Sequence, residues 1–503
     1  MSKRRKTASR AVPTFGAPTE DDDEMTAMAS SDSVSTRTLP PTTVPSLLTL
    51  CMRRFVDKYT YLRQNPEGRL WRHTSQSLRM LPEPLLPRLF AMLSQRWPTF
   101  LPDNVIQPYF MRDARSIVLS DALTGVKKQT VNSLKICAPR LNHLELSGFS
   151  KFEDNLLAGI LSHLPELKTL NLRGCKEVGH ATMEAAANHC PGLEVANFNY
   201  TSVTPISLQG LLVNCKDLRV LKVAGISSWS DGTLQKLLAA LSTSNITTLP
   251  ALHNLKLRQL SISNTSATPF VALFPNLRRL DISFTNIQHI PTSSPYIEKL
   301  AMSSTPLAIS FGGFATSSRS YPFPAEYLQL RTLNIGALGQ SAKSSGALVL
   351  TDGLLMDLTD VLTPLEHLEH VNLASNAKLT SNSISDFMMH TTNATKTINL
   401  SGIPRLRSDG LAGLVAEDGT ECAIEVLTLN NTAIDDDAAP YIACCKQLSR
   451  LGLASTRITK DGLFTIIDAC PRLENIKLTS CRGVKLQDRK RIFELWEEEK
   501  QSK

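Results

Sequence analysis

Several features that would mark a membrane, secreted or redox protein are missing from this 503-residue sequence. No uninterrupted apolar run approaches the roughly 18 residues that a membrane helix needs, and the amino end has no apolar signal core. Aromatic residues make up only 6% of the chain, and its ten cysteines include no C-x-x-C pair. We therefore expect no membrane span, no disulfide framework, and no zinc or thiol-redox site.

The motifs of common enzyme classes are absent as well. The sequence has no Walker A loop, no H-E-x-x-H, no G-x-S-x-G and no strand-linked G-x-G-x-x-G. Histidines such as His143, His180 and His370 have no carboxylates or thiols at ligand spacing, so we interpret them as surface residues. The sequence predicts a protein that is not an enzyme and that has no catalytic residue, bound metal or cofactor.

The first 43 residues have the composition of a disordered tail. They combine an acidic block, residues 20–24, with a Ser/Thr/Pro-rich stretch and lack the apolar clusters that would offset the entropy lost on ordering. The run Lys3-Arg4-Arg5-Lys6 resembles a nuclear-localisation patch, although solvated charge explains it equally well. We therefore expect the protein to be located in the nucleus, the cytoplasm or both. The net charge of +8 is too modest over this length to favour nucleic acid as a partner.

From about residue 112 the chain repeats the unit L-x-x-L-x-L. The alternating half of each unit predicts a short strand, and the following ten or so residues carry apolar side chains at helical spacing. One unit cannot bury this surface alone, so stacked units form a curved α/β solenoid with a parallel inner sheet and outer helices. The common interval is 24–29 residues, the leucine-rich-repeat range. The fourteen copies begin at residues 114, 141, 167, 193, 218, 257, 277, 297, 330, 368, 395, 424, 448 and 473.

Six cysteines recur at fixed places in this repeat. Four lie three residues ahead of a strand leucine, and Cys175 and Cys481 follow the strand as L-x-L-x-x-C. The pattern, carried by "CPGLEVANF", "CKDLRVLKV" and "CPRLENIKLTSC", resembles the cysteine-containing leucine-rich-repeat family, which includes ribonuclease-inhibitor-like, F-box-associated and AMN-type proteins. We interpret these thiols as small buried hydrophobes of the core. The four that precede a leucine are Cys190, Cys215, Cys445 and Cys470.

The repeat divides the chain into four segments. They are the tail (1–43), a helical segment (44–110), the solenoid (111–484) and a charged C-terminal helix or cap (485–503). The copies at 257, 277 and 297 are only 20 residues apart, which is too short for a full helix and predicts 3₁₀ or extended returns. The Gly-, Ser- and aromatic-rich insertion 305–325 predicts a loop that contacts a ligand or is disordered.

The helical segment opens with a short motif on one helical stripe. Ser46, Leu47, Cys51 and Phe55 form S-L-x-x-x-C-x-x-x-Φ, which looks like the box that docks elongin C in cullin-based ubiquitin ligases. An amphipathic helix here is also explained as a cap over the exposed end of the solenoid core. The cap alternative predicts that Leu47 and Cys51 are buried against the first repeats.

A second motif lies at residues 81–90. Leu81, Pro82, Leu85 and Leu89 fit Φ-P-x-x-Φ-x-x-x-Φ, which is similar to the cullin-contacting box of von Hippel–Lindau-type receptors. The same stretch also resembles the start of an F-box, which would bind a Skp1-type adaptor, although the second half of an F-box is missing. Both resemblances imply that the N-terminal helices bring a bound protein to a ubiquitin ligase.

The x positions of x-L-x-L-x face the concave surface because the leucines point into the core. Their side chains are mostly small or amide, which suits an extended peptide better than a phosphate backbone. A basic group beside the 305–325 loop suits an acidic element of a protein partner, with solvated surface charge as the alternative. The predicted partner-binding residues are Arg279, Lys299, Arg331, Asn334, Asn372 and Asn399.

Three hypotheses remain open from the sequence. The first is a non-catalytic substrate-recognition subunit of a cullin–RING ubiquitin ligase, with elongin C or a Skp1-type adaptor, a cullin and a protein substrate as partners. The second is an interaction scaffold whose residues 44–110 only cap the solenoid. The third, implied by the family resemblance, is a nuclear DNA-repair or chromatin accessory protein, which would need a contiguous basic stripe.

Overall fold

The computed structural model describes residues 36–38, 45–291, 294–306, 329–339, 349–363, 365–391, 394–415 and 422–502. The predicted tail, residues 1–43, therefore lies outside the described part except for Thr36–Thr38, which form a strand. Residues 307–325 of the predicted 305–325 loop also lie outside it.

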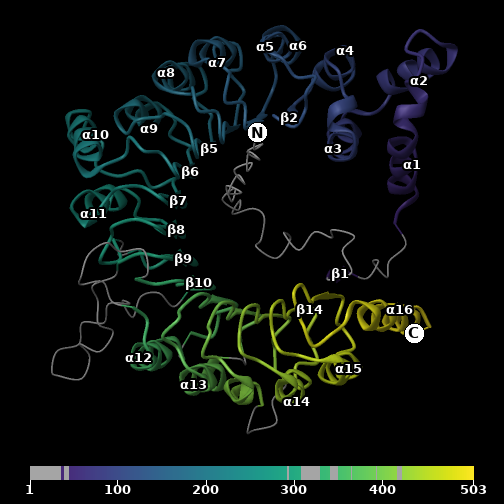
Figure 1. Ribbon diagram of the computed structural model, residues 1–503. Helices are drawn as coiled ribbons and strands as arrows, with labels where there is room; N and C mark the ends of the chain where they lie inside the picture. Colours follow the sequence, from purple (N-terminus) through teal and green to yellow (C-terminus); the bar gives the residue numbers. More distant parts are fainter. Residues whose placement is uncertain are drawn as a thin grey trace, which may run out of the picture.

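The described residues form one curved 15-stranded sheet in which β2 to β15 are parallel and follow one another in chain order. Figure 1 shows the strands on the inner side of the curve and the helices on the outer side. This confirms the predicted leucine-rich-repeat solenoid. The strands are β2 Ser116–Ser120, β3 His143–Ser147, β4 Thr169–Asn171, β5 Val195–Asn197, β6 Val220–Lys222, β7 Asn254–Lys256, β8 Arg279–Asp281, β9 Lys299–Ala301, β10 Thr332–Asn334, β11 His370–Asn372, β12 Thr397–Asn399, β13 Val426–Thr428, β14 Arg450–Gly452 and β15 Asn475–Lys477.

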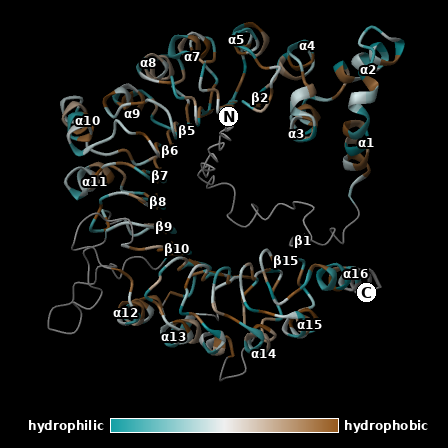
Figure 2. Cartoon of the chain, in the orientation of Figure 1, coloured by the Kyte–Doolittle hydropathy of each residue, from teal (hydrophilic) through white to brown (hydrophobic). Residues whose placement is uncertain are grey.

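The core lies between this sheet and the outer helices, and the repeat leucines fill it. Leu144, Leu170 and Leu221, for example, are each at most 1% exposed. Figure 2 shows hydrophilic residues on the outward surface of several of these helices. The helices are α5 Lys128–Asn132, α6 Leu134–Cys137, α7 Asp154–Leu161, α8 His180–His189, η5 Ile206–Leu208, α9 Gln209–Asn214, α10 Asp231–Thr243, α11 Asn264–Val271, α12 Asp352–Leu362, α13 Ser381–Thr391, η6 Ser408–Leu414, η7 Asp436–Ala438, α14 Ala439–Ile442 and α15 Lys460–Ala469.

The structure corrects the phase of one repeat. The sixth copy is Leu252/Leu255/Leu257, with β7 inside it, and not the copy predicted to begin at residue 257. The 25 residues between positions 252 and 277 then leave room for α11, so the predicted short return there is wrong. Between β8 and β9 the described residues contain no helix, as the 20-residue interval predicted.

The helices of residues 45–111 cover the β2 end of the sheet. The first of them, α1, packs its buried residues Met52, Val56 and Tyr59 inward, and Trp97 Nε1 donates a hydrogen bond to Val56 O at 2.7 Å. Gly125 is needed where this segment meets the solenoid, because a Cβ there would lie 2.1 Å from the Leu101 carbonyl oxygen. The elements are α1 Leu47–Leu62, α2 Arg69–Arg79, η2 Glu83–Leu85, α3 Leu86–Arg96, η3 Pro98–Phe100, α4 Asp103–Ile106 and η4 Gln107–Met111.

At the other end of the sheet, two segments from opposite ends of the chain lie beside β15. Helix α16, Leu486–Ser502, buries Ile492, Phe493 and Trp496. Strand β1, Thr36–Thr38, pairs with β15 in antiparallel register, with Arg37 opposite Ile476. The chain therefore reaches the C-terminal edge of the sheet first and then begins the helices that cover the N-terminal edge.

Candidate protein-interaction surfaces

Helix α1 has two different apolar faces. One packs on the N-terminal helices through Met52, Val56 and Tyr59. The other, which we call the α1 stripe, faces away from them, and its Leu47 is 78% exposed. Spacings of three and four residues place the members of the stripe along one side of the helix. The α1 stripe consists of the exposed residues Leu47, Leu50, Cys51, Arg54, Lys58 and Tyr61.

The first predicted motif divides between these two faces. Ser46 is the N-cap of α1, where its Oγ accepts a hydrogen bond from Thr49 N at 3.3 Å, and Arg88 Nη2 of α3 donates to Thr49 Oγ1 at 2.8 Å. Phe55 is half-buried against the core. Leu47 and Cys51 remain exposed, so Ser46 and Phe55 position the helix while Leu47 and Cys51 are presented.

Most residues of the second predicted motif pack against the core instead of facing solvent. Leu89 is 3% exposed, and Leu81 and Leu85 are half-buried against the core. Of the four predicted residues of this motif, only Pro82 is exposed. Leu89 therefore cannot contact a cullin without leaving the core, which corrects its assignment as a binding residue. The physical reason is that α3 needs this face to pack on β2 and η4.

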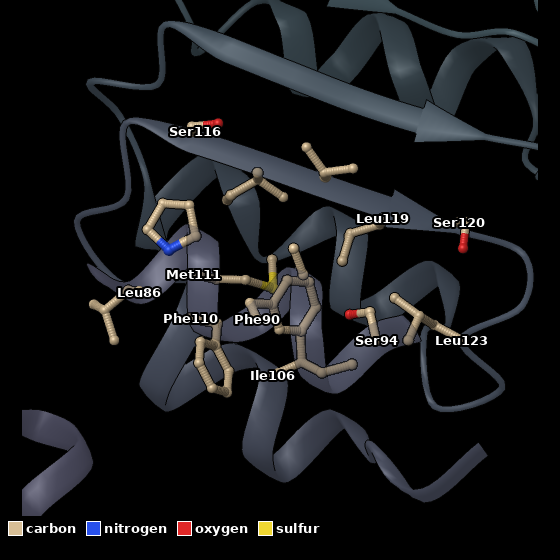
Figure 3. A pocket seen from close by; sticks show the side chains of 14 residues that line it. Leu86, Phe90, Ser94, Ile106, Phe110, Met111, Ser116, Leu119, Ser120 and Leu123 are labelled. Atoms are coloured by element: carbon tan, nitrogen blue, oxygen red, sulfur yellow. The ribbon is translucent and has the colours of Figure 1, made fainter. Parts of the chain in front are cut away.

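A groove runs along the seam between α3 and β2, where β2 is the last strand of the sheet. It consists of two adjoining cavities of about 260 and 300 Å³, which share Leu86, Pro87, Phe110 and Ser116. Figure 3 shows the side chains of α3 and η4 facing those of β2 across the cavity of about 260 Å³. The sequence did not reveal this groove because its lining comes from three separate segments.

On the concave face the predicted asparagines form a continuous row. Asn334, Asn372 and Asn399 are paired in register on β10, β11 and β12. Each Oδ1 accepts a hydrogen bond from the backbone N–H two residues later, for example from Ala374 N to Asn372 Oδ1 at 2.9 Å. Because the oxygen is engaged, the Nδ2 group of each amide remains for a partner, which makes the row a set of hydrogen-bond donors.

The predicted basic group is only partly assembled. Arg279 and Lys299 are neighbours in register on β8 and β9, but their partner on β10 is Thr332. Arg331 lies one residue earlier, with its Nη1 3.7 Å from Glu369 Oε1. Hydrogen bonding from Lys396 Nζ at 3.1 Å, followed by the charges of Lys396 and Arg331, lowers the pKa of Glu369. Arg331 therefore belongs to a row of ion pairs at the strand entrances.

The corrected phase of β7 adds two bases that the sequence analysis missed at concave positions. Lys256 is 4% exposed, and its Nζ lies 3.8 Å from Asp281 Oδ2. Arg258 places its guanidinium 4.7 Å from the ring centroid of Phe284. The sequence signal for both was the copy Leu252/Leu255/Leu257, which fits the repeat as well as the copy predicted to begin at residue 257.

The repeat cysteines occupy the core as predicted. Cys190, Cys215 and Cys470 end helices α8, α9 and α15. Their Sγ atoms lie within hydrogen-bonding reach of carbonyl oxygens of the preceding repeat, as from Cys190 to Leu164 O at 3.4 Å. Burial raises the pKa of Cys190 to about 12 and that of Cys215 to about 11. These thiols are therefore protonated and weakly reactive at neutral pH.

We predict a graded reaction of the ten thiols with a disulfide reagent such as 5,5′-dithiobis(2-nitrobenzoate). Cys51 is exposed and reacts first, Cys137 and Cys444 are half-buried and react slowly, and the other seven are buried. Those seven react only in denaturant, because the thiolate must form in water. Loss of the fast phase in Cys51→Ser identifies it; an unchanged fast phase would contradict the placement of Cys51.

Two kinds of site are absent from the described residues. Within them, no cluster of three or more His, Cys, Asp or Glu side chains is placed to hold a metal ion. None of the helices in these segments combines the length and the apolar composition needed to cross a membrane. The candidate surfaces are the α1 stripe, the concave face and the groove between α3 and β2.

Comparisons with known proteins match part of the chain. No family model matches it. A 157-residue segment is 32% identical to the antagonist of mitotic exit network protein 1 of Eremothecium gossypii and covers 30% of this chain and 37% of that protein. The protein of the same name from Candida glabrata is 31% identical over 159 residues, 30% of either chain. The matched segments thus span about a third of these relatives.

Among solved structures, the chain is similar to one from the Rad7 and Elc1 complex of yeast, with 18% identity over 88% of this chain and 95% of that chain and a TM-score of 0.46. It is also similar to a leucine-rich-repeat protein of Leptospira interrogans, with 16% identity over 80% of this chain and 92% of that chain and a TM-score of 0.40. The solenoid assignment itself comes from the strand order and repeats described above.

Proposed function

We propose that this chain is a non-catalytic substrate-recognition subunit of a cullin–RING ubiquitin ligase. In this proposal the α1 stripe binds a small adaptor protein, elongin C or a Skp1-type protein, and the concave face holds a protein substrate. The chain would act in the nucleus, the cytoplasm or both. The relatives named as antagonists of a mitotic regulatory network support a protein-binding role, since such antagonism can operate through a bound protein.

The observation that carries the proposal is the exposure of Leu47 and Cys51. If residues 44–110 served only as a cap, these side chains would be buried against the first repeats, whereas Leu47 is 78% exposed and Cys51 is exposed. The cap function is already performed by the opposite face, through Met52, Val56 and Tyr59. A helix with a second, unpartnered apolar stripe suits a groove on another protein.

The chemistry of the stripe indicates what kind of groove it fits. Leu47, Leu50 and Cys51 form its first turn, and Arg54 and Lys58 continue it. A complementary surface would place an apolar pocket against that turn and acidic residues beside the two bases. A cullin would contact exposed residues before and on α3, such as Pro82 and Arg88, instead of the buried Leu89.

The test is co-purification of the full chain with elongin B/C and, separately, with Skp1. Capture of elongin C supports a receptor of the elongin type, and capture of Skp1 alone supports the F-box version. If neither protein is captured, the ligase proposal is wrong and a capped solenoid scaffold is the better account. The DNA-repair hypothesis predicts instead a steep loss of DNA binding with rising salt.

A further inference from the structure

One backbone position is left-handed in every repeat of the solenoid after the first, and two of its occupants are unexpected. We call it the rim position: the residue two places after the last apolar residue of L-x-x-L-x-L. Thirteen of the fourteen described residues at this position have φ between +51° and +82°, and the exception is Asp121 of the first repeat. The rim N–H donates to a carbonyl of the next repeat, as from Phe284 N to Ser303 O at 2.8 Å. The thirteen are Gly148, Gly174, Tyr200, Gly225, Gln259, Phe284, Ser304, Ala337, Ser375, Gly402, Asn431, Ser455 and Ser480.

Eleven of these residues are small or polar, while Tyr200 and Phe284 are bulky aromatics. A left-handed backbone favours Gly and Asn, and a bulky side chain there costs on the order of 1 kcal/mol or more. The core does not need the Phe284 ring, which is 42% exposed. An aromatic residue that is unfavourable for the local backbone and largely outside the core points to a role in binding.

An arginine from the preceding repeat lies over each of the two rings. The Arg173 guanidinium lies 5.9 Å from the Tyr200 ring centroid, and that of Arg258 lies 4.7 Å from the Phe284 centroid. In both cases the arginine immediately precedes the rim residue of its own repeat, Gly174 or Gln259. Stacking on a ring holds the guanidinium in a fixed plane, and a fixed guanidinium matches the geometry of a carboxylate.

Further bases lie between and beside the two pairs. Arg279 on β8 is exposed and Lys299 on β9 is half-exposed. From β4 to β9 the described concave positions hold six bases and one acid, Asp281. Six strands at about 4.8 Å spacing cover roughly 24 Å, the length of about seven extended residues. Lys222 and Lys256 are buried, and Lys256 Nζ lies 3.8 Å from Asp281 Oδ2, so these two are not counted as binding residues. The other four bases, which we call the rim patch together with Tyr200 and Phe284, are Arg173, Arg258, Arg279 and Lys299.

We infer that the rim patch recognises an extended, Asp/Glu-rich segment of the substrate protein. The excess of positive charge, the fixed guanidinium groups and the length of the patch all match such a segment. This inference deepens the proposed function by naming the substrate class. It is independent of the α1 stripe, which lies on a different element and binds the ligase adaptor.

The test is fluorescence anisotropy with the full chain and a labelled 12-residue Asp/Glu-rich peptide. We expect about tenfold weaker binding for Arg258→Gln, because a charge-assisted contact is lost. Phe284→Ser introduces the residue found at four other rim positions, so it also weakens binding while the melting temperature stays equal or rises. Lys236→Gln, on the outer helix α10, removes the same charge from an exposed site and leaves the affinity unchanged.

Several outcomes would overturn the inference. These are equal loss of affinity in Lys236→Gln, unchanged affinity in Arg258→Gln and Phe284→Ser, equal binding of an Asn/Gln peptide, or binding confined to a phosphopeptide or a nucleic acid. Tighter binding after neutralising residues 20–24 would make the chain's own acidic block the occupant instead. Leu47→Ala/Cys51→Ala should bind the peptide normally, so a failure of adaptor capture and a failure of the rim patch are distinguishable.

Discussion

Replacing Leu47 and Cys51 together with alanine is expected to weaken capture of the adaptor protein by about 100-fold, because two central apolar anchors are each worth about 1–2 kcal/mol in such an interface. Neither side chain supports the fold, since both are exposed on α1. Alanine also favours helix, so α1 itself should persist. The measurement is the dissociation constant of the full chain for elongin B/C, or for Skp1 if that is the protein captured.

A matched control is available on the solenoid. Ile136 on α6 is 85% exposed, so Ile136→Ala removes a comparable apolar side chain from an unrelated surface. Both variants should retain the wild-type circular dichroism spectrum and melting temperature, and Ile136→Ala should bind the adaptor normally. Equal binding by the wild type and the double variant would show that the α1 stripe is not the docking surface.

The second large effect is expected on stability, at aspartates whose carboxylates bind the backbone of the next repeat. We call these contacts the joints between repeats. Asp154, at the start of α7, accepts hydrogen bonds from the backbone N–H groups of Gly179, Ala181 and Thr182 at 2.8–3.0 Å, at the start of α8. Asp154→Ala would leave these N–H groups without their acceptor. We expect a loss of about 3 kcal/mol in the free energy of unfolding, measured by urea denaturation.

The control for this change is Asp461, an exposed residue in the first turn of α15. Asp461→Ala should cost well under 1 kcal/mol, because only its favourable position near a helix N-terminus is lost. Similar costs for the two variants would show that the carboxylate of Asp154 does not join the repeats. Asp231 and Asp352 make the same kind of contact, to Ser263 and Thr380, so they are expected to behave like Asp154.

The same joints predict how stability depends on pH. Burial raises the pKa of Asp154, but the hydrogen bonds from Thr182, Gly179 and Ala181 outweigh it and lower the pKa below the ordinary value of 3.8. A group with a lowered folded-state pKa stabilises the protein fully above its unfolded pKa, and this contribution disappears as the pH falls through the folded pKa. The unfolding free energy of the wild type should therefore fall more steeply below about pH 4 than that of Asp154→Ala.

The Asp154 joint illustrates what a single sequence cannot show. A carboxylate in the first turn of a helix is common, and its local pattern predicts only a helix start. Its partners lie about 25 residues further along the chain and become neighbours only when the repeats stack. The two arginine–aromatic pairs of the rim patch arise in the same way, from residues one repeat apart.

The sequence by itself determined the solenoid, the core positions of its leucines and cysteines, and the amphipathic helix that opens the segment 44–110. Each of these depends on a local spacing of apolar residues, which stacking of the repeats does not change. The tertiary structure decided the phase of β7, since Leu252/Leu255/Leu257 and Leu257/Leu260/Ile262 compete for the same strand and only the stacking of neighbours selects one. It also decided which motif residues are available to a partner. Leu47 and Leu89 both lie on amphipathic helices, but Leu47 is exposed on α1, whereas packing of α3 on β2 buries Leu89.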